Sequence, residues 1–299
     1  MKKIIYIFVL LMATLSCTNT EEELLHEVTV SFSPALYSNT RTTEDNNYPT
    51  NTPFRVWAYS LPVNAQGESK TSNASVFMNN EMVSYQSGSW TTSEPYRWKS
   101  DKKLTFFAYS PASVHATCNY ENGITIPNHD MNDGIDLLYA RPLEDVENLY
   151  NNGCISLPFR SAFAQVNFKV RSMMPIGYHV HLKKLFIEKL AYIGTFQLKP
   201  KEKWITTADR MPYDFYNGDR EFGYSSEDAG TLTLMPQTID QPIKMLIDLY
   251  DSNDKLVIAD KTIESATMSN CWKPGKYYSY TLNIYSDSIT FTTDIIDGL

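Results

Sequence analysis

Hydrophobic and polar residues alternate with a period of two through most of this chain. VTVSF places Val28, Val30 and Phe32 on one side of a strand, and QVNFKV repeats the pattern over residues 166–170. The same alternation recurs in FRVWAYS, KLTFFAYSP, KKLFIEKL, SYTLNIYS and DSITFTTDII. A period of two is typical of strands that bury one face and expose the other. The pattern therefore predicts a chain built mainly from short antiparallel strands.

Turn-forming residues separate these segments. Clusters of Asn, Asp, Gly, Ser and Pro lie between the alternating stretches and predict tight connections. One segment, RPLEDVENLY, predicts a short helix instead, because Leu143, Val146 and Leu149 recur at helical spacing. Many short strands joined by such turns are typical of β-sandwiches. We therefore predict an all-β fold with two tandem antiparallel β-sandwich domains, at residues 28–159 and 160–299.

Length and composition agree with this interpretation. The chain has 299 residues, which exceeds the usual size of one domain. Aromatic residues make up 13% of it and include 20 tyrosines, and aromatic residues favour strands. The formal net charge of −8 disfavours nucleic acid as a partner.

Residues 1–16 have the pattern of a secretory signal. Two lysines precede an apolar run that is shorter than the roughly 20 residues needed to span a bilayer. Cys17 follows directly, as in bacterial lipoproteins, although Thr14 stands three residues before it where leucine is usual. We therefore expect a signal peptide at residues 1–16, lipidation of Cys17 and a lipidated tether at residues 17–27. The alternative is a plain signal with an incidental cysteine.

Candidate chemistry is sparse. The chain has no GxSxG motif for a catalytic serine. His179 and His181 would face the same way on a strand, but no third metal ligand is apparent, so we expect a solvated or packed strand face there. Cys118, Cys154 and Cys271 are widely spaced and odd in number, so they imply no disulfide framework. We therefore expect no catalytic residue, no cofactor and no metal site.

Seven segments in chain order together resemble the fimbrillin-like family, the surface lipoproteins that form type V fimbriae in Gram-negative anaerobes. They are TRTTEDNNYPTNTPFRVWAYS, GSWTTSEPYRWKSDKKLTFFAYSPAS, NDGIDLLYARP, LPFRSAFAQVNFKV, GTFQL, LMPQTI and CWKPGKYYSYTLNI. The chain departs from the family pattern before its first such strand, where the usual Trp and Gly-Asp are missing. The resemblance implies two β-sandwich domains of transthyretin-like topology and an outer-membrane lipoprotein exposed at the cell surface.

The resemblance also implies a mode of assembly. In polymerising members an arginine-specific surface protease cuts near the N-terminus, the first strand leaves, and a strand of another fimbrial subunit fills the groove. Arg41 lies in the polar stretch SNTRTTED just after the strand EVTVSF, so it is the candidate cleavage residue. The alternative is a solvated charge in an anchor or tip subunit that is never cut.

The candidate donor strand is the C-terminal segment 286–299. Its alternating residues are Ile289, Phe291, Thr293 and Ile295, and strand addition requires only such a period of two. The alternative is an ordinary last strand of its own domain.

The expected function is therefore a non-enzymatic fimbrial subunit or a fimbria-associated adhesin, with a host or bacterial surface molecule as a further candidate ligand. The rival hypothesis is a glycan-binding surface lipoprotein of a polysaccharide-uptake system. A sugar site would need two or three aromatic side chains on one exposed platform, and Trp90, Tyr96 and Trp98 are the best local candidates.

Overall fold

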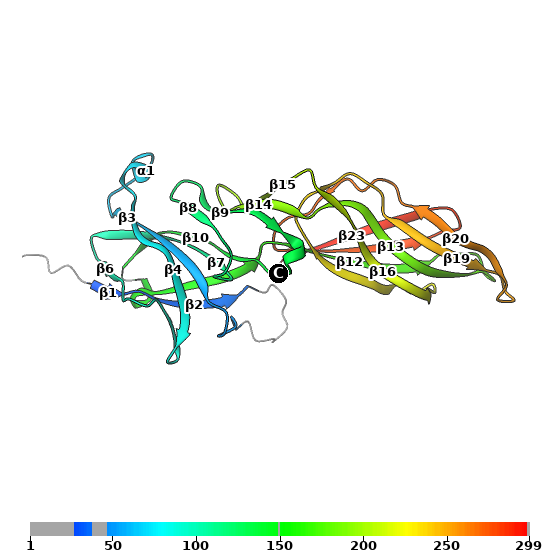
Figure 1. Cartoon of the computed structure of the whole chain (residues 1–299), viewed down its shortest axis with the longest axis horizontal. Coiled ribbons are helices and arrows are strands. Elements are labelled where there is room, and N and C mark those ends of the chain that lie inside the picture. The colour runs from blue at the N-terminus through cyan, green and yellow to red at the C-terminus, as the bar shows by residue number, and fades with distance from the viewer. Residues whose placement is uncertain (1–26, 38–46, 149, 298–299) are drawn as a thin grey trace, which may run out of the picture.

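The computed structural model (Figure 1) describes residues 27–37, 47–148 and 150–297, and strands dominate that part of the chain. Its helices there are one short α-helix and two 3₁₀ segments, α1 (Ser69–Asn73), η1 (Met131–Asp133) and η2 (Tyr150–Gly153). None of the helices in the described ranges is long and apolar enough to cross a membrane. The predicted all-β fold is confirmed.

The strands form an elongated molecule, and we call β1–β11 its first half and β12–β23 its second half. In the first half, seven strands close into a barrel in the order β10-β11-β2-β5-β4-β3-β7. Their bounds are β2 (Ser31–Leu36), β3 (Phe54–Pro62), β4 (Ser75–Gln86), β5 (Ser89–Thr91), β7 (Lys102–Ser110), β10 (Leu138–Glu147) and β11 (Cys154–Ser161). A separate two-stranded sheet, β1 (Glu27–Thr29) with β6 (Arg97–Lys99), lies at one end.

The second half consists mainly of two four-stranded sheets. One has the order β17-β12-β22-β23 and the other β16-β13-β19-β20. Their bounds are β12 (Ala164–Ser172), β13 (His179–Ala191), β16 (Arg210–Glu221), β17 (Glu227–Leu234), β19 (Lys244–Tyr250), β20 (Leu256–Glu264), β22 (Lys276–Ile284) and β23 (Ile289–Asp297). A short pair, β18 (Thr238–Ile239) with β21 (Asn270–Cys271), completes it.

The predicted alternation accounts for both cores. Phe54, Val56 and Ala58 point into the first half, whereas Val166 and Phe168 point into the second, and all five are fully buried. Alternate residues of a strand lie on opposite faces, so one face of each of these strands meets the core.

A third sheet joins the two halves. Strands β8 (Thr117–Asn119) and β9 (Gly123–Asp130) of the first half pair with β14 (Ile193–Gln197) and β15 (Lys203–Thr206) of the second, in the order β15-β14-β9-β8. This sheet covers the outer face of β3 and β7, where Trp57 and Tyr109 stack at 5.7 Å between ring centroids. Those two strands are therefore buried on both faces.

The predicted helix at RPLEDVENLY is wrong. Residues up to Glu147 belong to strand β10, whose pairing with β7 shifts register on both sides of Leu143. Asp145 has a φ of +55°, which fits such an irregularity. The two β-bulges place Leu143 and Val146 three residues apart on one face, and this spacing imitates a helical turn.

The three cysteines within the described part of the chain, Cys118, Cys154 and Cys271, are free thiols. Burial raises the pKa of Cys118 to about 12, so its thiol stays protonated and unreactive at neutral pH.

Candidate assembly site

Strand β2 lies between two strands of the first half that are far from each other in sequence. It pairs with β11 in parallel over six residues, from Ser31 opposite Cys154 to Leu36 opposite Phe159. On its other side the register is a single pair, Phe32 opposite Trp90 of β5. The strand is therefore held along one edge by a continuous ladder and on the other edge by little backbone pairing.

Buried side chains hold β2 in place more firmly than its backbone pairing with β5 does. Val30 and Phe32 are almost fully buried, as the predicted alternation required. The Phe32 ring meets Phe54 at 6.0 Å and Phe106 at 6.3 Å between centroids, both edge to face. Burial of one such side chain stabilises a fold by about 1.5–3 kcal/mol. We call the space that β2 fills, between β11 and β5 and floored by Phe54 and Phe106, the β2 groove.

The chain that leaves β2 returns to the same groove. The amide of Tyr37 donates to the Phe159 carbonyl, and Asn47 forms an isolated bridge with Ala35. Arg41 lies between these two anchors, and both Arg41 and Cys17 lie outside the described residues. Because both ends of this connection are bound at the rim of the groove, a cut within it would leave the residues that pair with β2 in place.

Tyr48 closes the rim of the β2 groove. Its ring contacts Phe54, Trp90 and Phe159 at 5.0–5.7 Å between centroids, and its hydroxyl lies 2.5 Å from Ser110 Oγ. Burial raises the pKa of Tyr48 to about 12, against the lowering effect of the Ser110 hydrogen bond. Sequence reasoning missed this residue, and the one available signal was a lone tyrosine before proline in a polar segment.

The candidate donor strand is paired within its own half. β23 forms nine antiparallel pairs with β22, from Ile289 opposite Ile284 to Asp297 opposite Lys276. Ile289 is buried and Phe291 packs partly against the same core, whereas Thr293 is exposed and Ile295 is 56% exposed. Ile289 and Phe291 therefore pack against the core of the second half, whereas Thr293 and Ile295 do not.

The proposed aromatic platform for sugars is wrong. Trp98 is fully buried and Trp90 is only 8% exposed, because both lie in the core of the first half. The Trp98 indole N–H donates to the Lys102 carbonyl, and Tyr96 packs on Phe77 at 5.5 Å. Rings that fill a core cannot stack on a sugar in solvent.

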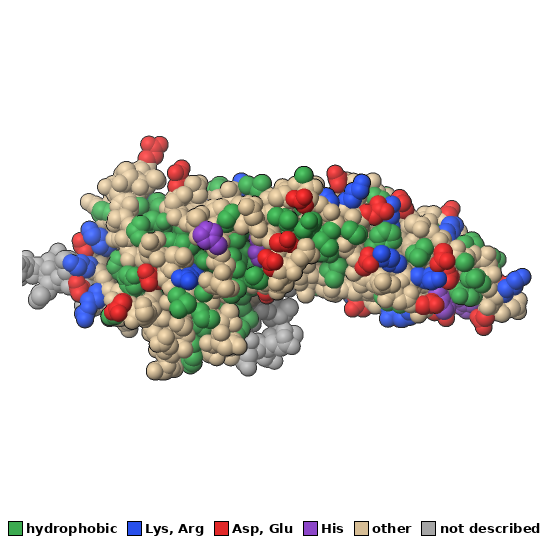
Figure 2. Space-filling view, viewed as in Figure 1, with side chains coloured by type: hydrophobic (Ala, Val, Ile, Leu, Met, Phe, Trp, Pro, Cys, Tyr) green, Lys and Arg blue, Asp and Glu red, His purple; other side chains and the backbone are tan. Residues whose placement is uncertain are grey.

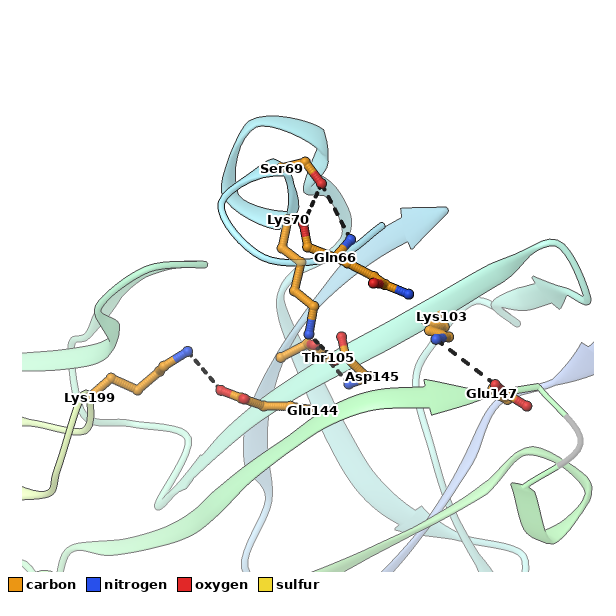
Figure 3. Close-up of polar contacts among 9 residues, drawn as sticks. All are labelled: Gln66, Ser69, Lys70, Lys103, Thr105, Glu144, Asp145, Glu147 and Lys199. Atoms are coloured by element: carbon orange, nitrogen blue, oxygen red, sulfur yellow. Dashed lines mark hydrogen bonds and ion pairs between the residues drawn. The ribbon is translucent and has the colours of Figure 1, made fainter. Parts of the chain in front are cut away.

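A row of carboxylates on β10 forms ion pairs with lysines from both halves of the molecule (Figure 3). Glu144 pairs with Lys199 at 2.7 Å, Asp145 pairs with Lys70, and the Glu147–Lys103 distance is 4.0 Å. The amide of Asp145 also donates to the buried Thr105 hydroxyl.

The three lysines come from three different segments: the connection that contains α1, strand β7, and the turn between β14 and β15. Exposed pairs contribute about 0–1 kcal/mol each, so this array orients segments more than it stabilises them.

His179 and His181 lie side by side on β13, as predicted for alternate strand residues. Their Nδ1 atoms contact Glu221 at 3.0 Å and Asp219 at 2.8 Å. No three or more His, Cys, Asp or Glu side chains are grouped to hold a metal ion in the ranges that the structure describes.

His129 lies at the sheet that joins the halves, and sequence reasoning missed it. It pairs with Gly194 across β9 and β14, is 6% exposed, and contacts the rings of Phe163 and Trp204 at 5.4 and 5.7 Å. Its Nε2 is buried without a hydrogen-bond partner among the described residues. Burial lowers the pKa of His129 below its usual 6.5, and the carboxylates of Asp133 and Asp130 oppose this shift.

We expect acidification to destabilise the sheet that joins the two halves. The unfolded chain binds a proton at His129 near pH 6.5, whereas the folded chain binds it only at lower pH. The stabilisation is therefore present above about pH 6.5 and is lost as the pH falls below it. Urea unfolding at about pH 7.5 and about pH 5.5 should show this loss in the wild type. His129→Phe should reduce it, and His115→Ala, at an exposed histidine, should not. An unchanged pH dependence in His129→Phe would contradict the assignment.

The sequence matches the model of a family described as fimbrillin-like over residues 40–297. No curated protein sequence matches it.

Among solved structures, a fimbrial protein from Bacteroides vulgatus superposes with a TM-score of 0.68 at 19% identity, covering 90% of this chain and 99% of its own. Proposed cell adhesion proteins from Bacteroides uniformis and Bacteroides ovatus each have a TM-score of 0.49 at 14% identity. The match to the Bacteroides uniformis structure covers 91% of this chain and 98% of that chain, and the match to the Bacteroides ovatus structure covers 92% and 98%, respectively.

Proposed function

Because this chain belongs to the fimbrillin-like family, we propose that it is a non-catalytic fimbrial subunit that joins other copies by exchanging strands. The observation that supports this most strongly is the β2 groove, which β2 fills with one long ladder and the buried Phe32 ring, with Val30 buried just before the strand. A groove filled in this way leaves unpaired backbone groups and apolar pockets once the strand departs, and both are templates for another strand.

The first step is a cut after Arg41. The seven other arginines all lie in strands, where the backbone is poorly accessible to proteases: Arg55, Arg97, Arg141, Arg160, Arg171, Arg210 and Arg220. A cut after Arg41 separates β1, β2 and Cys17 from the rest of the chain. A lipid on Cys17 would hold the precursor at the outer membrane, and the cut would release the subunit from it.

The second step is the entry of β23 from another copy. Segment 286–299 offers Ile289, Phe291, Thr293 and Ile295 on one side, which matches the side that Val30 and Phe32 present in the β2 groove. The donor gives up nine pairs with β22 and gains a ladder with β11. The ladder with β11 spans six residues and is shorter than the nine pairs given up, so the apolar pockets of the vacated groove must favour the exchange.

The test uses an arginine-specific protease on the purified chain, residues 18–299. We expect one new N-terminus directly after Arg41 and a ladder of multimers on an unboiled denaturing gel that collapses on heating. Arg41→Lys keeps the charge and removes the cleavage residue, so this variant should give neither product. Complete cleavage after Arg41 without a ladder would refute strand exchange between copies.

A further inference from the structure

The candidate donor segment repeats the residue pattern of the strand that it would replace. Residues 30–37 read VSFSPALY and residues 289–296 read ITFTTDII. Aligned without a gap, both begin with a β-branched residue, carry phenylalanine between two hydroxyl residues, and have an aliphatic residue at the seventh position. Phe291 then takes the position of Phe32, and Ile289 takes that of Val30. Because Phe32 and Val30 are buried, the matching donor side chains are those that would enter the β2 groove.

The same register defines the outer face of the donor, since alternate residues of a strand point to opposite faces. Asp294 takes the position of Ala35, and Ile296 takes that of Tyr37. Residues 30–37 contain no charged side chain, so the donor brings a carboxylate to a strand position that has none in the uncut chain. In β23, Asp294 is exposed and forms no ion pair with another described residue.

Arg160 lies on this outer face, where β2 ends. Leu36 is opposite Phe159 in the last pair of the parallel ladder. The residues that follow are in contact, because the Arg160 guanidinium lies over the Tyr37 ring, 3.3 Å from its centroid. Phe159 is buried in the core, so Arg160 points away from it. In the uncut chain this cation–π contact holds the end of β2.

The Arg160 guanidinium has no polar partner in the ranges that the structure describes. Its Nε is buried without a hydrogen bond, and no carboxylate there forms an ion pair with it. Glu202 lies close to Tyr139, the β10 residue opposite Arg160. Its carboxylate pairs instead with Arg141 at 3.3 Å. On the face seen in Figure 2, most basic side chains lie beside acidic ones, so a partly buried cation without a carboxylate is a site for an anionic group.

We propose that Arg160 recognises the incoming strand by exchanging the Tyr37 ring for the Asp294 carboxylate of a second copy of this chain. The donor runs parallel to β11, as β2 does, and Asp294 stands opposite Pro158. Arg160 follows Pro158 by two residues on the same face of β11. Diagonal neighbours of this kind are about 7–8 Å apart, within reach of a long side chain. The inference rests on the proposed exchange of strands.

This change of partner favours the donor over the strand that it replaces. A carboxylate supplies the acceptor that Arg160 Nε lacks, whereas the Tyr37 ring does not. Hydrogen bonds between ionised groups are stronger than those between neutral groups. The cut after Arg41 leaves Tyr37 on the departing segment and Arg160 on the subunit, so the cation becomes free when β2 leaves.

The first test adds a synthetic peptide of residues 286–299, in excess, to the chain cut after Arg41 and measures how much peptide displaces the first segment. We expect Asp294→Ala in the peptide to weaken binding about fivefold, and to have no effect on a chain with Arg160→Gln. Asp287→Ala removes a carboxylate that lies before the aligned residues and should leave binding unchanged. Equal binding of the Asp294→Ala and unchanged peptides to the wild-type chain would overturn the role of Arg160, and this comparison requires no altered protein to fold.

A second measurement tests the register. Thr290 takes the position of Ser31, opposite the free thiol of Cys154, which is only partly buried. A Thr290→Cys peptide should therefore be joined to Cys154 by dibromobimane, a short reagent that links two thiols. Thr292→Cys lies about 7 Å further along the strand and should give about tenfold less product. Cys154→Ser in the chain should abolish the product, which excludes reaction at another cysteine.

The outcomes separate this inference from the proposed function. Peptide binding without dependence on Asp294, or with crosslinks from Thr292→Cys in place of Thr290→Cys, would overturn the inference and leave strand exchange standing. A peptide that neither displaces the first segment nor reaches Cys154 would overturn strand exchange, and the role of Arg160 with it.

Discussion

Replacing Phe32 by alanine is expected to lower the free energy of unfolding of the first half by about 3–5 kcal/mol. The Phe32 ring is almost fully buried and packs edge to face on Phe54 and Phe106. Truncation removes this burial and leaves a cavity between rings that strands β3 and β7 hold in place. Urea unfolding followed by tryptophan fluorescence measures the loss, because Trp90 and Trp98 lie in the same core.

A matched control lies on the same strand. Ser33 is exposed and belongs to the same ladder with β11, so Ser33→Ala should change the stability by less than about 0.5 kcal/mol. In the chain cut after Arg41, Phe32→Ala should also speed the release of β2, because the cut strand is held by non-covalent contacts alone. A loss below about 1 kcal/mol would mean that Phe32 does not anchor β2 in its groove.

Local pattern identifies strands that face water on one side. Alternation places Val166 and Phe168 in a core because their neighbours in β12 are more polar and one face is apolar. Strands β3 and β7 are different, since Trp57 and Tyr109 are buried on the second face by a sheet that includes β14, from far along the chain. The nearly continuous apolar residues of FRVWAYS and KLTFFAYSP are the sequence signal that indicates burial on both faces.

Local pattern fails where backbone irregularity changes the period. In β10 two bulges convert a strand into a segment with three-residue spacing, so the helix prediction followed from a correct reading of Leu143 and Val146. Trp98 lies in a segment rich in Ser, Thr, Glu and Lys, which suggests an exposed side chain. The ring is buried because β6 closes the end of the barrel, and no local pattern encodes that contact.

The β2 groove depends on pairing between distant segments. β2 and β11 are separated by more than 100 residues, and no periodicity specifies which strand lies beside which. The same arrangement occurs in the second half, where its first strand β12 runs parallel to β22. β12 continues almost directly from β11 and cannot leave the sheet by a cut near the N-terminus, whereas β2 can. The two parallel pairs therefore differ in whether a cut near the N-terminus can free one of their strands.

Replacing Ile295 by aspartate is expected to abolish multimers while leaving the subunit folded. Ile295 is 56% exposed on β23, so the change should alter the free energy of unfolding by less than about 0.5 kcal/mol. As a donor residue it would enter the apolar β2 groove, where an unpaired carboxylate is strongly disfavoured. The measurement is the heat-sensitive ladder after cleavage at Arg41, together with urea unfolding of the uncut variant.

Thr292, on the same strand β23, provides the control for a charge at that strand. Thr292 is exposed and points to the opposite face from Ile295, so in a donor strand it would remain in solvent. Thr292→Asp should therefore give a normal ladder, and Ile295→Asp should give none. Equal ladders from both variants would show that the groove does not receive this face of β23. Loss of the ladder in both would indicate that negative charge anywhere on the strand prevents assembly, and then the apolar alternation of residues 289–295 would not be what the groove recognises.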